Sequence, residues 1–205
     1  MRNKVAVSTY SFSNILYSEK MPDLESLFQT IHDLGLDGVE IVAFNITDQA
    51  AHSPMGPRDP DKSPDPLLPD GTSVTPGETP IHKMDPEKMK ALLEQMSRVG
   101  RTRPSSIPKI KELLERYNLE VCNMPVDFGD IGNPNQEERM ADLEMMKMWI
   151  DIAAELGSPS VRINSGHINY DDNGQLDFSI CIDSYQKLAE YGAQKNVVIT
   201  MENHG

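Results

Sequence analysis

Short apolar runs alternate along this chain with segments whose apolar residues recur at helical spacing. The runs cover residues 4–8, 38–43, 119–124, 160–164 and 197–201. The segment that begins at Asp23, for example, places Leu27, Phe28 and Ile31 on one helical face. When strands and helices alternate in this way, each crossover is right-handed and the strands run parallel. The sequence therefore predicts an α/β fold with a parallel sheet.

Five parallel strands are compatible with two architectures, an open doubly wound sheet and the first part of a TIM (β/α)8 barrel. The loop after the first strand, residues 9–14, contains no glycine. It therefore lacks the phosphate-binding turn expected of a nucleotide-binding doubly wound fold. We expect residues 1–205 to form an incomplete TIM barrel of about five β/α units, with an open doubly wound binding domain as the alternative.

An insertion is predicted at residues 45–104, after the second strand. Eight of the chain's fifteen prolines lie between Pro54 and Pro80, so this stretch cannot form a regular element. Only one short helix is expected within it, beginning at Asp85. Because the insertion leaves the carboxyl end of a strand, it can serve as a lid, as a docking arm or as a plain surface loop. The segment from Pro54 to Pro80 is also the expected site of limited proteolysis.

Charge and cysteine content limit the kinds of partner and the cellular location that we expect for this chain. The formal net charge of -13 would repel a nucleic acid, and no apolar run reaches the length of a membrane span. The two cysteines, Cys122 and Cys181, have no CxxC partner, which is typical of reduced thiols. The N-terminal residues lack the apolar core of a signal peptide. We expect a cytoplasmic protein that binds a small molecule rather than nucleic acid or a membrane.

Polar residues at strand ends are the candidates for chemistry, because parallel α/β folds build their sites there. Glu202 follows an apolar strand, and its carboxylate can bind a hard divalent cation or pair with an arginine. Glu40 lies within its strand and suits either substrate contact or a salt bridge, for instance to Arg162. Arg162 offers a donor fork for a hydroxyl, phosphate or carboxylate, and His167 follows a Ser-Gly loop that can bring its imidazole over a substrate.

Four segments, in their order and spacing, resemble the strand motifs of the xylose isomerase-like TIM barrel family, the sugar phosphate isomerase/epimerase group. They are residues 5–12, 34–41, 156–166 and 198–205. The resemblance spans the chain except for the insertion.

The resemblance implies that Glu202 is the first ligand of a divalent metal, Mn, Mg, Co or Zn, and that it is catalytic. In that family an Asp, a His and a second Glu from later strands complete the site, and this chain has no counterpart of them. Glu40 and Arg162 match positions that face substrate, and His204 matches a histidine that commonly follows the metal-binding Glu. We expect metal binding by this chain alone to be weak.

The implied activity is that of a sugar isomerase or epimerase, which moves a proton next to a carbonyl of a sugar or sugar-like polyol; related members are dehydratases. The chain would hold only part of the site and be inactive alone. The alternatives are a non-catalytic barrel fragment or partner subunit, and the doubly wound binding domain. Exposed barrel edges further predict association, including homo-oligomers.

Overall fold

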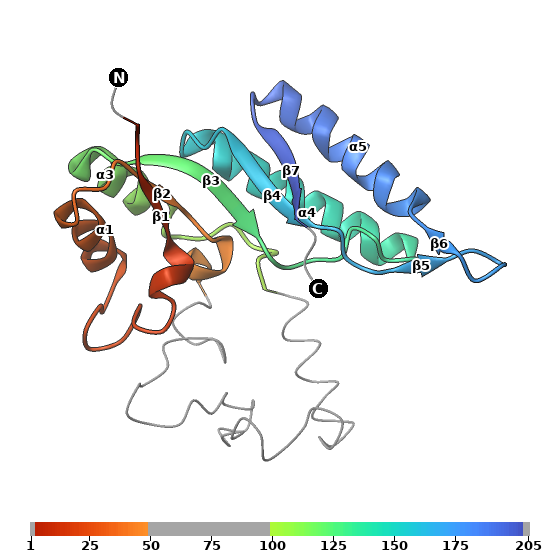
Figure 1. Cartoon of the computed structure of the whole chain (residues 1–205), viewed down its shortest axis with the longest axis horizontal. Helices are drawn as coiled ribbons and strands as arrows, with labels where there is room; N and C mark the ends of the chain where they lie inside the picture. Colours follow the sequence, from red (N-terminus) through yellow and green to blue (C-terminus); the bar gives the residue numbers. More distant parts are fainter. Residues whose placement is uncertain (1–2, 49–98, 203–205) are drawn as a thin grey trace, which may run out of the picture.

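The computed structural model describes residues 3–48 and 99–202 and contains a parallel sheet of five strands (Figure 1). The strands lie in the order β1-β2-β3-β4-β7 and have these bounds: β1 Ala6–Ser8, β2 Gly38–Glu40, β3 Glu120–Val126, β4 Ser160–Asn164 and β7 Val198–Glu202. A separate antiparallel hairpin, β5 Asn169–Tyr170 with β6 Leu176–Asp177, projects from the sheet at one end of the molecule. Strands that are neighbours in the sheet therefore follow one another along the chain, as in a barrel.

Helices form where the sequence places them, and side chains cap two of them. The helices are α1 Leu24–Asp33, α3 Ile107–Tyr117, α4 Gln136–Glu155 and α5 Ser179–Gln194, and the short 3-10 helices η1 Thr9–Phe12 and η2 Ala43–Ile46 follow β1 and β2. The carboxylate of Asp23 accepts a hydrogen bond from the Ser26 N–H, and Asn135 does the same for the first turn of α4. Ser106 precedes α3 but makes no capping bond; its hydroxyl donates to the carbonyl of Ile46 at 3.0 Å.

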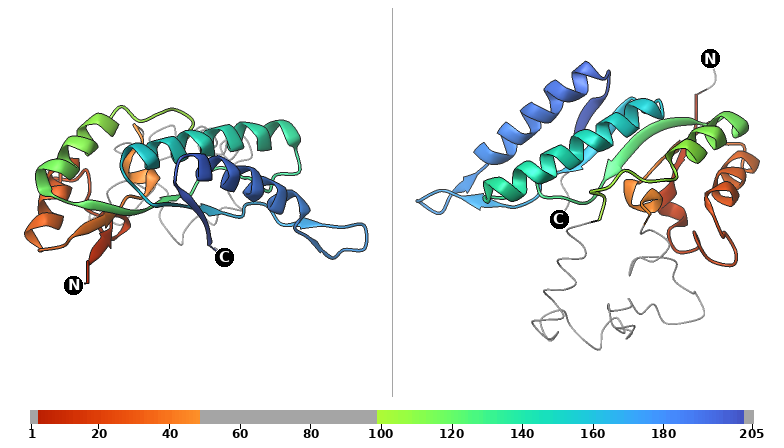
Figure 2. Two further views of the ribbon diagram at one scale, coloured as in Figure 1. Left: turned by 90° about the horizontal axis from the view of Figure 1, so that it is seen from above. Right: turned by 180° about the vertical axis from the view of Figure 1, so that it is seen from behind.

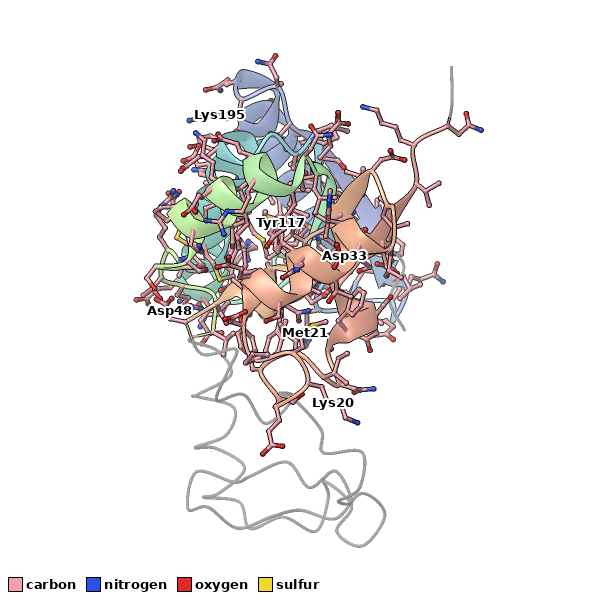
Figure 3. All side chains as sticks on the ribbon, turned by 90° about the vertical axis from the view of Figure 1, so that its left-hand side faces the viewer. Lys20, Met21, Asp33, Asp48, Tyr117 and Lys195 are labelled. Carbon is pink, nitrogen blue, oxygen red and sulfur yellow. The ribbon has the colours of Figure 1, made fainter. Side chains whose placement is uncertain are left out.

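The four α-helices within the described residues lie on one face of the sheet (Figure 2). Outward side chains of the central strands are fully buried beneath them, among them Val39, Met124 and Val161. On this outer layer α1 packs against α3, and α4 packs against α5. Figure 3 shows the molecule from the side on which α1 and α3 lie. A doubly wound sheet would carry helices on both faces. The one-sided cover confirms the predicted α/β barrel fold in incomplete form and excludes the doubly wound alternative.

The core fills the space between the sheet and the helices. Trp149 of α4 is fully buried, and its indole N–H donates to the carbonyl of Gly100 at 2.9 Å. Phe128 packs against the same indole with 5.5 Å between ring centroids. The hydrogen bond between Trp149 and Gly100 holds the start of the second described segment against α4.

Strand bounds differ from the predicted runs mainly in the second strand. The apolar run was expected to extend over residues 38–43, but β2 ends at Glu40 and the chain turns into η2. Ile41, Val42 and Ala43 are buried all the same, so their apolar character reflects packing rather than strand pairing. The hairpin β5–β6 was not predicted. Most of the 45–104 insertion, including the helix expected from Asp85, lies outside the described residues.

The free edge of β7 predicts self-association. Among the described residues no strand pairs with β7 on the side away from β4, and Val198 on this strand is 62% exposed. Val198→Lys places a charge on the edge and should shift the chain toward monomer by several-fold in dissociation constant, as measured by sedimentation velocity at increasing concentration. Ile182→Lys, on the surface of α5, is the matched control and should leave association unchanged. A wild-type chain that stays monomeric at micromolar concentration would contradict this prediction.

Candidate active site at the carboxyl ends of the strands

Strand alternation separates the side chains of β4 onto two faces. Val161 and Ile163 are buried beneath the helices, so Arg162 and Asn164 point to the opposite, inner face. The register pairs Arg162 with Thr200 and Asn164 with Glu202. Glu202 therefore lies at the carboxyl end of β7, beside the last residue of β4.

A guanidinium joins three segments at this edge. Arg162 Nε lies 2.8 Å from Glu202 Oε2, and Arg162 NH1 contacts Asp127 Oδ1 and, at 2.7 Å, Asn164 Oδ1. The Arg162 side chain is only 15% exposed, whereas that of Glu202 is 46% exposed. Two carboxylates thus share one cation, which leaves this cluster with a net charge of about -1 and holds the guanidinium in a fixed orientation.

Glu40 belongs to a neighbouring network instead. Its Oε2 accepts a hydrogen bond from Asn123 Nδ2 at 3.0 Å, and Asn123 Oδ1 accepts one from the Ser160 hydroxyl at 2.8 Å. The salt bridge considered between Glu40 and Arg162 does not form; Asp127 and Glu202 are the carboxylates that pair with this guanidinium. Sequence reasoning missed Asp127. It lies directly after β3, but the predicted run ended at residue 124, two residues before the strand does, so the strand-end rule that selected Glu202 stopped short of it.

His167 lies in the loop after β4 and is fixed through its backbone. Its N–H donates to Asp130 Oδ1 at 2.7 Å, and its Nδ1 lies 4.0 Å from Asp130 Oδ2. The imidazole itself is 58% exposed and therefore accessible to a ligand. The structure thus brings Arg162 and Glu202 into contact, places Glu40 in the adjoining network and puts His167 on a separate loop. His204 lies outside the described residues.

The described residues offer a metal only part of a coordination shell. No group of three or more His, Cys, Asp or Glu side chains within residues 3–48 and 99–202 has the geometry to hold an ion. Glu202 is an exposed carboxylate at the carboxyl edge of the sheet, and one of its two oxygens pairs with Arg162. Zn²⁺ takes about four ligands and Mg²⁺ about six, so a single carboxylate such as that of Glu202 supplies one position at most.

The model of the xylose isomerase-like TIM barrel family matches residues 84–205, more than half of the chain. The chain belongs to this family. The match includes β3, β4 and β7, the three strands whose ends form the Arg162 cluster. No curated protein matches the chain significantly.

Solved structures agree with the family's fold. The chain is similar to a 3-keto-D-glucoside 4-epimerase from E. coli, with 14% identity, a TM-score of 0.55, and coverage of 98% of this chain and 56% of that one. It is also similar to an L-ribulose 3-epimerase, with 13% identity, a TM-score of 0.55, and coverage of 98% of this chain and 49% of that one. A third similar structure is that of the IOLI protein, which holds a zinc atom; the identity is 10%, the TM-score is 0.54, and coverage is 97% of this chain and 51% of that one. The chain thus spans about half the length of these proteins, and at such identities the likeness concerns the fold alone.

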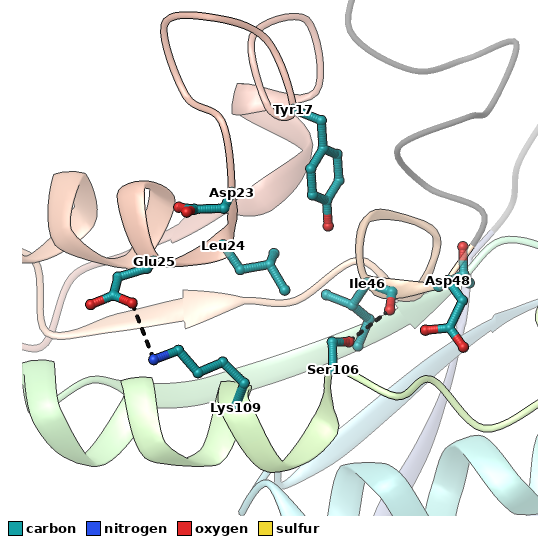
Figure 4. A pocket seen from close by; sticks show the side chains of 9 residues that line it. Tyr17, Asp23, Leu24, Glu25, Ile46, Asp48, Ser106 and Lys109 are labelled. Carbon is teal, nitrogen blue, oxygen red and sulfur yellow. Dashed lines mark hydrogen bonds and ion pairs between the residues drawn. The ribbon is translucent and has the colours of Figure 1, made fainter.

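A pocket of this family member lies away from the cluster, between the amino ends of α1 and α3 (Figure 4). The Tyr17 hydroxyl points into it and donates to the carbonyl of Asn45 at 2.8 Å. Burial, followed by the negative charges of Asp23 and Asp48, raises the pKa of Tyr17 to about 12. At the pocket wall Lys109 pairs with Glu25 at 3.1 Å.

The raised pKa of Tyr17 predicts a loss of stability at high pH. The folded chain binds this proton more tightly than the unfolded chain, whose tyrosines have a pKa of about 10. The contribution is therefore complete below pH 10 and is lost as the pH rises toward 12, with a magnitude of about 1–2 kcal/mol after solvent screening. Denaturant titrations between pH 9 and 11.5 should show this loss in wild type and not in Tyr17→Phe. Tyr10→Phe, which alters an exposed phenol, should behave as wild type. An identical pH slope in Tyr17→Phe and wild type would refute the assignment.

Proposed function

We propose that this chain carries part of the active site of a metal-dependent isomerase or epimerase, which acts on a sugar or sugar-like polyol by proton transfer next to a carbonyl. The observation that carries the proposal is the place of Glu202 at the carboxyl edge of a barrel sheet, where its side chain is 46% exposed and pairs with Arg162 through only one oxygen. Family membership and the epimerase names of two similar structures support the reaction class. The zinc atom in the IOLI structure supports a divalent metal cofactor, Mn, Mg, Co or Zn.

Each described residue has a role that its position allows. Glu202 would hold the metal with the oxygen that Arg162 does not engage. When bound, the metal supplies positive charge next to substrate oxygens and so favours an enediolate. Arg162, fixed between two carboxylates, can donate a hydrogen bond to a substrate oxygen without reorganising. Glu40 and His167 would contact substrate hydroxyls from the adjoining network and the loop, and His204 would contact substrate beyond the described residues.

The extent of the chain matters for the proposal. Since it spans about half the length of the similar epimerases, we propose that it supplies only part of the site and is inactive alone. A second candidate is a non-catalytic partner that completes an assembly through the edge of β7, where no described strand pairs. Association of either kind, including homo-oligomers, would use this edge.

We also propose a cytoplasmic location and a small-molecule ligand. No described helix combines the length and apolar character required to span a membrane. Both cysteines are free, which supports the proposed cytoplasmic location. The net charge of -13 supports a small-molecule rather than a nucleic-acid ligand.

Glu202→Gln tests the metal assignment. Glutamine keeps the size of the side chain and an oxygen for Arg162, but it removes the charge that a divalent ion requires. We expect at least a tenfold loss of Mn²⁺ affinity by calorimetric titration and, in a protein that contains the remaining barrel strands, at least a hundredfold loss of sugar isomerisation or epimerisation. His204→Ala should impair turnover more than metal binding.

The matched control is Glu190→Gln, an exposed carboxylate on α5, which should leave both quantities unchanged. Wild-type metal affinity and turnover in Glu202→Gln would remove Glu202 from the site and most of the functional case with it. Sugar turnover that persists after metal chelation would refute the metal dependence alone.

A further inference from the structure

The parallel register of β3 and β4 continues beyond the last strand residues. Val126 pairs with Ile163, an offset of 37 residues. Three later contacts keep that offset of 37: Asn164 Nδ2 to Asp127 Oδ1 at 3.4 Å, His167 N to Asp130 Oδ1 at 2.7 Å, and Asn169 Nδ2 to Gly132 O at 2.8 Å. Side-chain oxygens and amides thus replace backbone pairing, and the two loops run side by side away from the Arg162 cluster.

Two glycines allow the loops to come this close. A Cβ on Gly132 would lie 2.7 Å from the carbonyl oxygen of His167. A Cβ on Gly166, whose φ is +77°, would lie 2.2 Å from Asp130 Oδ1. A Cβ at either position would displace its neighbour, the His167 backbone at Gly132 and the Asp130 carboxylate at Gly166, so the contact between Asp130 and the His167 backbone depends on this pair of glycines.

Asp130 is itself held from the helix side. Its N–H donates to Asp142 Oδ2 at 2.9 Å, and Asp142, which is 5% exposed, pairs through Oδ1 with Arg101 at 2.8 Å. Asp130 Oδ1 also accepts the Gly132 N–H at 3.1 Å. The carboxylate therefore has a fixed place between α4 and the loop that carries His167.

We propose that Asp130 is a positioning residue, which holds the backbone of His167 in the β3–β4 register so that its exposed imidazole meets the substrate at the carboxyl edge of the sheet. This deepens the proposed function and rests on it. Asp130 touches no substrate; it acts through the His167 N–H and through the carboxylate that faces His167 Nδ1 at 4.0 Å. A fixed imidazole loses less conformational freedom on binding than one on a free loop.

Hydrogen exchange of the His167 amide tests the positioning directly, with no substrate present. In wild type this amide should exchange slowly; in Asp130→Ala it should exchange at least tenfold faster, and in Asp130→Asn, which retains an acceptor oxygen, at an intermediate rate. Asp171→Ala is the matched control, because Asp171 also accepts two backbone N–H bonds, from Asn173 and Gln175, but only within its own loop. It should leave the His167 amide protected. Equal protection in Asp130→Ala and wild type would overturn the proposal.

A double-mutant cycle, in a protein that contains the remaining barrel strands, tests whether Asp130 acts through His167. Asp130→Ala and His167→Ala should each raise the KM for the sugar by about tenfold, with a smaller effect on kcat, and the double variant should be no worse than His167→Ala alone. Asp130→Asn should recover part of the loss, and Asp171→Ala should match wild type. Additive effects of the two substitutions would overturn the proposal and leave the proposed function intact. If the wild-type protein with the remaining barrel strands turns over no sugar, the proposed function fails, and the exchange rates then decide the role of Asp130 alone.

Discussion

One-sided burial of the sheet is the constraint on which the rest of the structure depends. A strand residue that faces the helices must be apolar, as Val39, Val161 and Ile163 are, and its neighbours along the strand must then face the other way. In β4 this places Arg162 and Asn164 on the inner face. A polar cluster at the inner carboxyl edge is therefore a consequence of the same alternation that builds the core.

That cluster contains more negative than positive charge, and this balance shapes its chemistry. Arg162 neutralises one of the two carboxylates that it contacts, so an added cation is favoured electrostatically where the excess charge lies. Glu202 is the more exposed of the two carboxylates, and its Arg162 contact uses one oxygen. Asp127 is less exposed and also accepts from Asn164. This difference supports different proposed roles for two similar side chains: Asp127 would orient the guanidinium, and Glu202 would remain available to a ligand.

Sequence reasoning identified the elements better than the contacts between them. The periodicity of α1 and α4 and the apolar run of β4 were sufficient because each is a local property. The pairing of Arg162 with Asp127 was not predictable in the same way, since it depends on the register between two strands that are distant in sequence. The hairpin β5–β6 had a local signal, the turn at Asn173-Gly174, but its strands have only two residues each and bury little apolar surface. Of the residues selected from the sequence, Arg162 and Glu202 meet, while Glu40 bonds to Asn123 and Asp127 contacts Arg162.

The offset of 37 residues shows how strand register extends into a loop region that sequence patterns do not describe. Backbone pairing stops after Val126 and Ile163, yet an aspartate on one loop continues to meet the residue opposite it on the next. Such a contact requires a hydrogen-bond acceptor on one loop and small residues on both loops. Asp130 provides the acceptor, and Gly132 and Gly166 provide the space. Both loops leave the strands that the Arg162 cluster joins. The pairing of β3 with β4 and the contact between Asp130 and His167 therefore fix the position of His167 relative to Arg162, although no hydrogen bond joins their two side chains.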